Sequence, residues 1–245
     1  MTDLARDRLI VALDVASLED ARAIVDELGD EVSFYKVGPH LFVSGLINFI
    51  DELIKERRKH VFLDFKSFDI GDTVRVMASR AAKLGIEFMT IARAASTITA
   101  AQAGREGRPI PKILVVTLLT DQSQDDMQRE FNTKKSVEEF VAERAQLAED
   151  AGADGVICSP NEVRAVRRAV RRRDFLIVTP GIRLAESASD DQKRTASPAN
   201  AIAAGADYLV VGRPIVRAPN RLQAARLILG DMQQALVPSR IRAAG

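Results

Sequence analysis

Eight short runs rich in Val, Ile and Leu recur along this chain of 245 residues, and they constrain its fold more than any other feature. Both faces of each run are mostly apolar, which is the pattern of parallel strands buried on both sides. The predicted strands are Leu9–Leu13, Ser33–Val37, Val61–Phe65, Glu87–Ile91, Ile113–Leu118, Gly155–Cys158, Phe175–Thr179 and Tyr208–Val211.

Amphipathic stretches separate these runs, with apolar residues returning every three or four positions, and they predict helices. The clearest are Leu18–Leu28, Thr73–Lys83, Ser136–Ala151 and Arg221–Leu236. Strict alternation of strand and helix implies a parallel sheet with right-handed crossovers. Eight such units in 245 residues favour a single α/β domain over residues 1–245, an eight-stranded parallel (β/α)8 TIM barrel. An open doubly wound sheet is the structural alternative.

The charge balance argues against a large anionic partner. The 35 Lys and Arg residues nearly cancel the 34 Asp and Glu residues, so nothing global favours binding to nucleic acid or to a membrane surface. Met1 to Arg8 lacks the pattern of a secretory signal, and no apolar stretch is long enough to span a membrane. The lone Cys158 fits a reducing compartment, and we interpret it as a small buried residue that ends a strand. The sequence therefore predicts a cytoplasmic protein.

Charged residues stand at the ends of three successive predicted strands. Asp14 follows the first strand, Lys36 ends the second, and Asp64 and Lys66 end the third. Alternation along a strand places Asp64 and Lys66 on one face together with Phe62, which in a barrel can be the interior. Burying four charges costs more free energy than packing apolar groups there, so a functional cluster explains them better than a stabilising one.

A second candidate site follows the last two strands. Thr179-Pro180-Gly181-Ile182-Arg183 ends the seventh strand and Val211-Gly212-Arg213-Pro214 ends the eighth. In barrels of this kind these loops commonly bind phosphate through backbone N–H groups and Arg side chains. The polar segments Thr120–Lys134 and Arg183–Pro198 are long, and we interpret them as loops that close over a ligand.

Metal chemistry and nucleophilic triads find little support in the sequence. The two histidines, His40 and His60, have no other ligand type at metal-binding spacing and are interpreted as surface or hydrogen-bonded polar residues. No Ser, His and Asp set and no P-loop spacing can be assembled. The remaining candidate residues predict a site for a small molecule that is held by its phosphate and faces Lys and Asp side chains.

With these motifs the chain resembles the orotidine 5'-monophosphate decarboxylases, from Leu9 to about Ile215. The resemblance implies a homodimer that decarboxylates this nucleotide to uridine 5'-monophosphate in pyrimidine biosynthesis, without metal or cofactor. The motifs that carry it are Ala12-Leu13-Asp14, Tyr35-Lys36-Val37-Gly38, Asp64-x-Lys66-x-x-Asp69-Ile70 with Thr73-Val74, Val116-Thr117-x-Leu119-Thr120, Thr179-Pro180-Gly181-Ile182-Arg183, Asp191-Gln192-x-Arg194 and Val211-Gly212-Arg213-Pro214-Ile215.

The resemblance also implies a role for each site residue. Asp14 and Lys36 would hold the ribose hydroxyls, and Lys36, Asp64, Lys66 and Asp69 would form a charge network in which Lys66 is the general acid. The remaining implied roles are contact with the pyrimidine or its loop by Thr120, phosphate binding by Gln192, Gly212 and Arg213, support of the lid by Arg183, and completion of the partner subunit's site by Asp69 and Thr73.

The chain departs from the family pattern at four places that carry no named chemical role. Gly71-Asp72 replaces the usual Pro-Asn, Ala92-Arg93 stands where His is common, and Ser67 and Phe68 replace an apolar residue and a His. Two other functions stay open at this point. One is a Mg²⁺-dependent phosphosugar decarboxylase or synthase of the same suprafamily, and the other is a non-catalytic barrel that binds a phosphorylated ligand.

Overall fold

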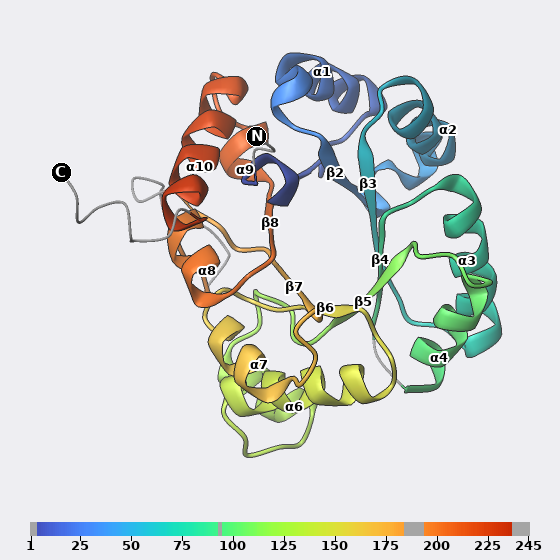
Figure 1. The fold of residues 1–245 in the computed structure, drawn as a ribbon, viewed down its shortest axis with the longest axis vertical. Helices are drawn as coiled ribbons and strands as arrows, with labels where there is room; N and C mark the ends of the chain where they lie inside the picture. The colour runs from blue at the N-terminus through green and yellow to red at the C-terminus, as the bar shows by residue number, and fades with distance from the viewer. Residues whose placement is uncertain (1–3, 93–94, 184–193, 237–245) are drawn as a thin grey trace.

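A computed structural model describes residues 4–92, 95–183 and 194–236, and its eight parallel strands close into a barrel in sequence order. Figure 1 shows the ring of strands with the helices around its outside. This confirms the predicted barrel, and no strand end differs from its predicted position by more than two residues. The strands are β1 (Leu9–Ala12), β2 (Phe34–Val37), β3 (His60–Ser67), β4 (Phe88–Ile91), β5 (Lys112–Val116), β6 (Gly155–Ile157), β7 (Leu176–Thr179) and β8 (Tyr208–Val211).

The helices cover the outer face of the barrel. Those at Leu18–Leu28 and Arg221–Leu236 have the predicted bounds, and the other two clear predictions differ by one or two residues at each end. The helices are α1 (Leu18–Leu28), α2 (Leu46–Asp51), α3 (Gly71–Leu84), α4 (Ala95–Gly104), α5 (Gln124–Glu130), α6 (Val137–Asp150), α7 (Val163–Ala169), α8 (Pro198–Ala204), α9 (Arg213–Val216) and α10 (Arg221–Leu236), with short turns at Arg6–Arg8, Gly29–Glu31, Pro39–Ser44 and Glu52–Glu56.

The segment after β5 differs from the expected loop. Between Thr120 and Lys134 the chain forms α5, which begins with a capping box. The hydroxyl of Ser123 accepts the N–H of Asp126, and the Asp126 carboxylate accepts the N–H of Ser123 at 2.9 Å. Two otherwise unpaired N–H groups are satisfied in this way, which allows a polar segment to be helical. Most of the other expected loop, Arg183–Pro198, lies outside the described residues.

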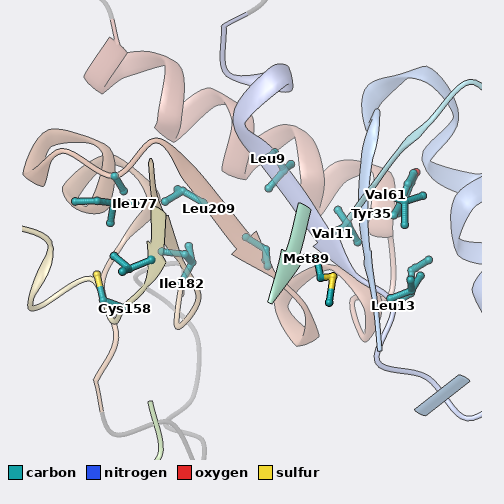
Figure 2. Packing of buried hydrophobic residues seen from close by; sticks show 14 of the residues in the cluster. Leu9, Val11, Leu13, Tyr35, Val61, Met89, Cys158, Ile177, Ile182 and Leu209 are labelled. Carbon is teal, nitrogen blue, oxygen red and sulfur yellow. The ribbon is translucent and has the colours of Figure 1, made fainter. Parts of the chain in front are cut away.

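Buried side chains form two layers around the sheet. Residues that point outward from the strands, such as Leu9, Val11 and Leu209, pack under the helices (Figure 2). Cys158 belongs to this layer, is fully buried directly after β6, and has its thiol pKa raised by burial, as expected for an inert apolar residue. The described residues include no helix long and apolar enough to cross a membrane.

The second layer fills the inside of the barrel. Phe34, Phe88 and Tyr208 meet with ring centroids 5.0 to 6.0 Å apart in tilted or edge-to-face contacts. Phe62 joins them at 5.9 Å from Phe88 and lies two residues beyond His60, the residue of β3 that pairs with Phe34. This aromatic floor closes the interior from the amino-terminal side, so any ligand space lies at the opposite end.

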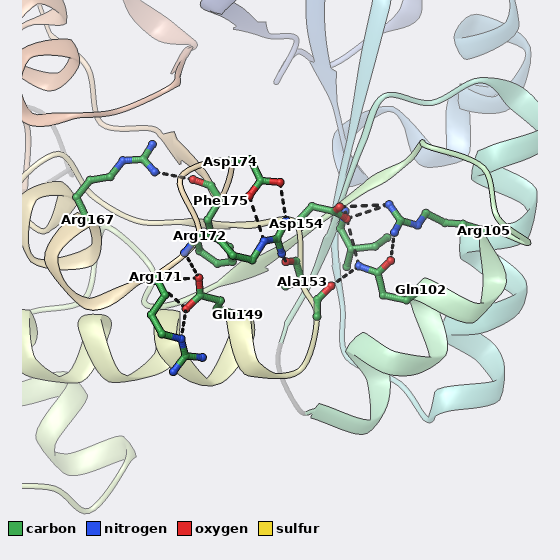
Figure 3. Close-up of polar contacts among 12 residues, drawn as sticks. Gln102, Arg105, Glu149, Ala153, Asp154, Arg167, Arg171, Arg172, Asp174 and Phe175 are labelled. Carbon is green, nitrogen blue, oxygen red and sulfur yellow. Dashed lines mark hydrogen bonds and ion pairs between the residues drawn. The ribbon is translucent and has the colours of Figure 1, made fainter.

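Buried carboxylates hold the amino-terminal side of the barrel together (Figure 3). Glu149 of α6 is buried and accepts the backbone N–H groups of Arg171 and Arg172 at 3.0 and 2.6 Å. Asp154, just before β6, accepts the Ile113 N–H at 2.8 Å and pairs with Arg105 at 3.1 Å. The arginines of this region therefore serve structural contacts far from the carboxyl ends of the strands.

Candidate active site

A pocket of about 430 Å³ opens at the carboxyl ends of the strands, above the aromatic floor. Its charged side chains come from the first three strands and from the loops after β7 and β8, which are the two regions that the sequence singled out. The lining residues are Ala12, Asp14, Lys36, His40, Phe62, Asp64, Lys66, Val116, Leu118, Leu119, Thr120, Ile157, Pro180, Gly181, Arg183, Val210, Gly212, Arg213, Val216 and Arg217.

The Lys36 ammonium lies between two carboxylates at the base of the pocket. Its Nζ is 2.8 Å from Asp14 Oδ1 and 3.2 Å from Asp64 Oδ2. Burial alone would lower the pKa of Lys36, but the charges of Asp64 and Asp14 outweigh it and raise that pKa. Burial likewise opposes ionisation of Asp64, yet Lys36 and Lys66 hold its pKa below the ordinary value. Lys36 and Asp64 are therefore both charged at neutral pH.

Lys66 completes this cluster from the end of β3. Its Nζ lies 2.9 Å from Asp64 Oδ2, and its side chain is 43% exposed toward the pocket. The backbone of Lys66 has φ of 49°, a left-handed conformation that costs a residue with a Cβ roughly 1 kcal/mol. Lys66 therefore reaches the site through a local distortion of β3, and simple alternation of side chains along the strand does not describe it.

Thr90 of β4 lies behind the cluster and is fully buried. Its hydroxyl accepts the N–H of Lys66 at 2.9 Å and donates to Asp64 Oδ1 at 2.9 Å. Sequence reasoning did not select Thr90. The available signal was a single hydroxyl within the otherwise apolar run Phe88–Ile91, since such a group, once buried, needs a hydrogen-bond partner.

The loops after β7 and β8 bring arginine side chains to the pocket. Arg183 follows β7, and Gly212 and Arg213 follow β8. Arg217, four residues beyond Arg213, also lines the pocket. Gly212 has φ of −105°, which residues with a side chain also adopt, so backbone strain does not explain the glycine. What the glycine provides is the absence of a side chain beside the pocket, which lets the backbone approach a ligand. Arg217 was not predicted, although its spacing of four from Arg213 was a usable signal.

A buried ion pair supports the wall formed by the loop after β5. Arg194 lies 3.1 Å from Glu162, and both side chains are largely buried. The same guanidinium donates to the carbonyl of Leu119 at 2.7 Å, next to Thr120 in the pocket wall. This contact joins the chain just before α8 to the loop that carries Thr120.

Two of the expected site residues lie away from this pocket. Asp69 is exposed and accepts the N–H of Ile70 at 2.7 Å, while Thr73 lies on the first turn of α3. Neither lines the pocket of its own chain. Gln192 lies outside the described residues, as does Arg93.

The histidines occupy different surroundings. Both are exposed, as expected: His60 lies beside Glu87, and His40 lies at the pocket edge with Nδ1 3.9 Å from Asp14 Oδ1. Within the described ranges no three His, Cys, Asp or Glu side chains come together as candidate metal ligands.

The fold and pocket define a barrel enzyme with a catalytic end at the carboxyl termini of its strands. Residues 7–228 match the model of the orotidine 5'-phosphate decarboxylase / HUMPS family, and the chain belongs to this family. It is accordingly a carboxy-lyase.

Similar proteins cover almost the whole chain. Orotidine 5'-phosphate decarboxylases from Ruegeria pomeroyi and Nitrobacter winogradskyi are 45% and 47% identical to it, over 97% of this chain and 99% and 97% of theirs. The crystal structure of orotidine 5'-phosphate decarboxylase from Lactobacillus acidophilus superposes with a TM-score of 0.79 at 38% identity, covering 92% of this chain and 98% of that one.

Proposed function

We propose that the protein decarboxylates orotidine 5'-monophosphate to uridine 5'-monophosphate without a metal, with Lys66 as proton donor. The observation that carries this proposal is that Asp14, Lys36, Asp64 and Lys66 form one charge cluster in a pocket that Arg183 and Arg213 also line. The high identity to decarboxylases of this name over nearly the full chain supports the choice of substrate.

The reaction needs a fixed positive charge beside the reacting carbon. When the bond between C6 and the carboxylate breaks, its electron pair stays on C6 as CO₂ leaves. A preorganised ammonium group stabilises that carbanion more than it stabilises the substrate, and this lowers the barrier. Lys66 then transfers a proton from Nζ to C6 and regains one from water. Asp64 holds both lysines in place and repels the substrate carboxylate.

The remaining residues bind the nucleotide. Asp14 and Lys36 bind the ribose hydroxyls, and Thr120 contacts the pyrimidine or the loop over it. Gly212 and Arg213, together with Gln192, bind the phosphate, and Arg183 supports the lid. Holding the phosphate far from the scissile bond lets its binding free energy close the site and exclude water.

The proposed assembly is a cytoplasmic homodimer with shared sites. Asp69 and Thr73 lie outside their own pocket, and Asp69 stands between Phe68 and Ile70, which we call the apolar strip. Phe68 and Ile70 are 77% and 72% exposed, which is unusual for large apolar side chains unless another surface covers them. A partner placed over this strip would receive Asp69 and Thr73 at its own site.

Lys36 weighs against the Mg²⁺-dependent alternative. Its ammonium already lies between the carboxylates of Asp14 and Asp64, and it would repel a divalent cation there. A metal-dependent relative would instead need an additional carboxylate in the position of Lys36. In the cluster, the two lysine charges already balance the charges of the two aspartates.

The first test is the absorbance change of orotidine 5'-monophosphate with EDTA-treated protein, beside Lys66→Ala. We expect turnover by the wild type that survives chelation and falls by at least about 10³-fold in the variant, because both the charge and the proton donor are lost. Activity that EDTA abolishes would point to the metal-dependent relative. Tight binding of uridine 5'-monophosphate with no turnover would point to a binding barrel.

A further inference from the structure

We infer that Thr90 is a positioning residue, whose hydroxyl sets the places of both Lys66 and Asp64. The inference rests on the proposed function, because it concerns how the proton donor of that reaction is held. Thr90 touches neither the solvent nor the pocket. It acts through the two charged residues to which it is hydrogen-bonded.

The pairing of β3 with β4 explains why this position matters. Leu63 pairs with Met89 and Ser67 pairs with Ile91, so residues 64–66 of β3 stand opposite Thr90 alone. The regular ladder is interrupted over this stretch, and its N–H groups need other acceptors. The Thr90 hydroxyl supplies one for Lys66, at the residue with φ of 49°. The hydrogen bond thus offsets part of the strain that aims Lys66.

The same hydroxyl fixes the orientation of the Asp64 carboxylate. It accepts from the Lys66 N–H, so its single proton points to Asp64 Oδ1. The other oxygen, Oδ2, receives the ammonium groups of Lys66 and Lys36 at 2.9 and 3.2 Å. Each carboxylate oxygen therefore has its own partners, and rotation of the carboxylate would exchange a hydroxyl for two cations. Thr90 keeps the charge cluster in one arrangement.

The decisive comparison is between Thr90→Val, which keeps the shape and removes the hydroxyl, and Thr90→Ser, which keeps the hydroxyl. We expect Thr90→Val to lower kcat by at least about tenfold with KM within about threefold of wild type, since a misplaced proton donor affects the transition state more than binding. Thr90→Ser should retain kcat within about threefold. If Thr90→Val does not fold, Thr90→Cys replaces it, because a thiol is a much weaker hydrogen-bonding group than the Ser hydroxyl of similar shape.

Two further measurements separate positioning from general damage. Thr117→Val removes another buried hydroxyl, which donates to the Ile157 carbonyl at 2.8 Å, and it should leave kcat near that of the wild type. Amide hydrogen exchange at Lys66 should accelerate in Thr90→Val and stay slow in Thr90→Ser, whether or not the protein turns over substrate.

The outcomes for this inference differ from those for the proposed function. Full kcat in Thr90→Val, or equal activity of the Cys and Ser variants, would overturn the positioning role while leaving the decarboxylase in place. Absence of turnover in the wild type would overturn the proposed function, and with it the role of Thr90 in positioning a proton donor. Lys66 exchange would then still report whether the hydrogen bond exists.

Discussion

Asp64 links the chemistry of the pocket to the pH dependence of stability. Its pKa is lower in the folded protein than in the unfolded chain, so it stabilises the fold above the ordinary carboxyl pKa and loses this effect as the pH falls through the folded value. Each unit of lowering contributes about 1.4 kcal/mol. Asp64→Asn removes the titration.

We therefore expect the difference in the free energy of unfolding between wild type and Asp64→Asn to shrink as the pH falls from about 5 toward about 3. Urea unfolding of both proteins across this range measures it. A difference that is constant with pH would show that Asp64 does not ionise more readily in the folded protein.

The sequence located the charged residues of the site but not the way they are held. Asp64 and Lys66 both line the pocket, as the sequence predicted, but the distorted backbone at Lys66 means that regular alternation is not the reason. The left-handed backbone at Lys66 and the hydroxyl of Thr90 that supports it depend on how β3 pairs with β4. Pairing between strands is a tertiary property, and no pattern within either strand encodes the interruption.

Among the elements, short helices were harder to predict than long ones. α1 and α10 are 11 and 16 residues long, each buries at least four apolar side chains, and their bounds were correct. α5 has seven residues and one buried side chain, Met127, so its periodicity is weak. The Ser123 and Asp126 capping pair was a readable signal for it.

The glycine at position 71, where the family usually has Pro, is explained by the packing of α3 against α4. Gly71 begins α3, and a Cβ built there would lie 3.3 Å from the Cβ of Ala100 in α4. A Cβ at Gly104 of α4 would come within 2.2 Å of the Arg75 carbonyl in α3. The two helices therefore approach more closely than larger residues would allow.

Substituting Glu149 measures how much its hydrogen bonds between α6 and the segment before β7 stabilise the fold. In Glu149→Ala the buried N–H groups of Arg171 and Arg172 lose their acceptor, and we expect the free energy of unfolding to fall by about 2 to 4 kcal/mol. Glu149→Gln keeps one carbonyl oxygen and should cost less. Chemical denaturation measures both, with kcat unchanged because Glu149 lies outside the pocket. Equal stability of Glu149→Ala and wild type would contradict the structural role.

At the scale of the whole molecule, the proposed shared site predicts complementation. Asp69→Ala and Lys66→Ala subunits should each be nearly inactive as homodimers. When they are mixed, unfolded and refolded together, each heterodimer regains one site with Lys66 from one chain and Asp69 from the other. Steady-state kinetics before and after mixing measures this. No recovery, with heterodimers verified by mass, would remove Asp69 from the partner's site.

The aromatic floor of Phe34, Phe88 and Tyr208 affects how the substrate enters the pocket and how the products leave it. Because these rings close the barrel interior on its amino-terminal side, the pocket opens only at the carboxyl ends of the strands. In the proposed reaction, substrate, nucleotide product and CO₂ all pass through that opening. In the proposed reaction, CO₂ is small enough to leave past the bound nucleotide, whereas the nucleotide leaves only after its phosphate contacts at the rim are broken. For the proposed site we therefore expect release of the nucleotide to be slower than release of CO₂, and tighter phosphate binding to slow it further.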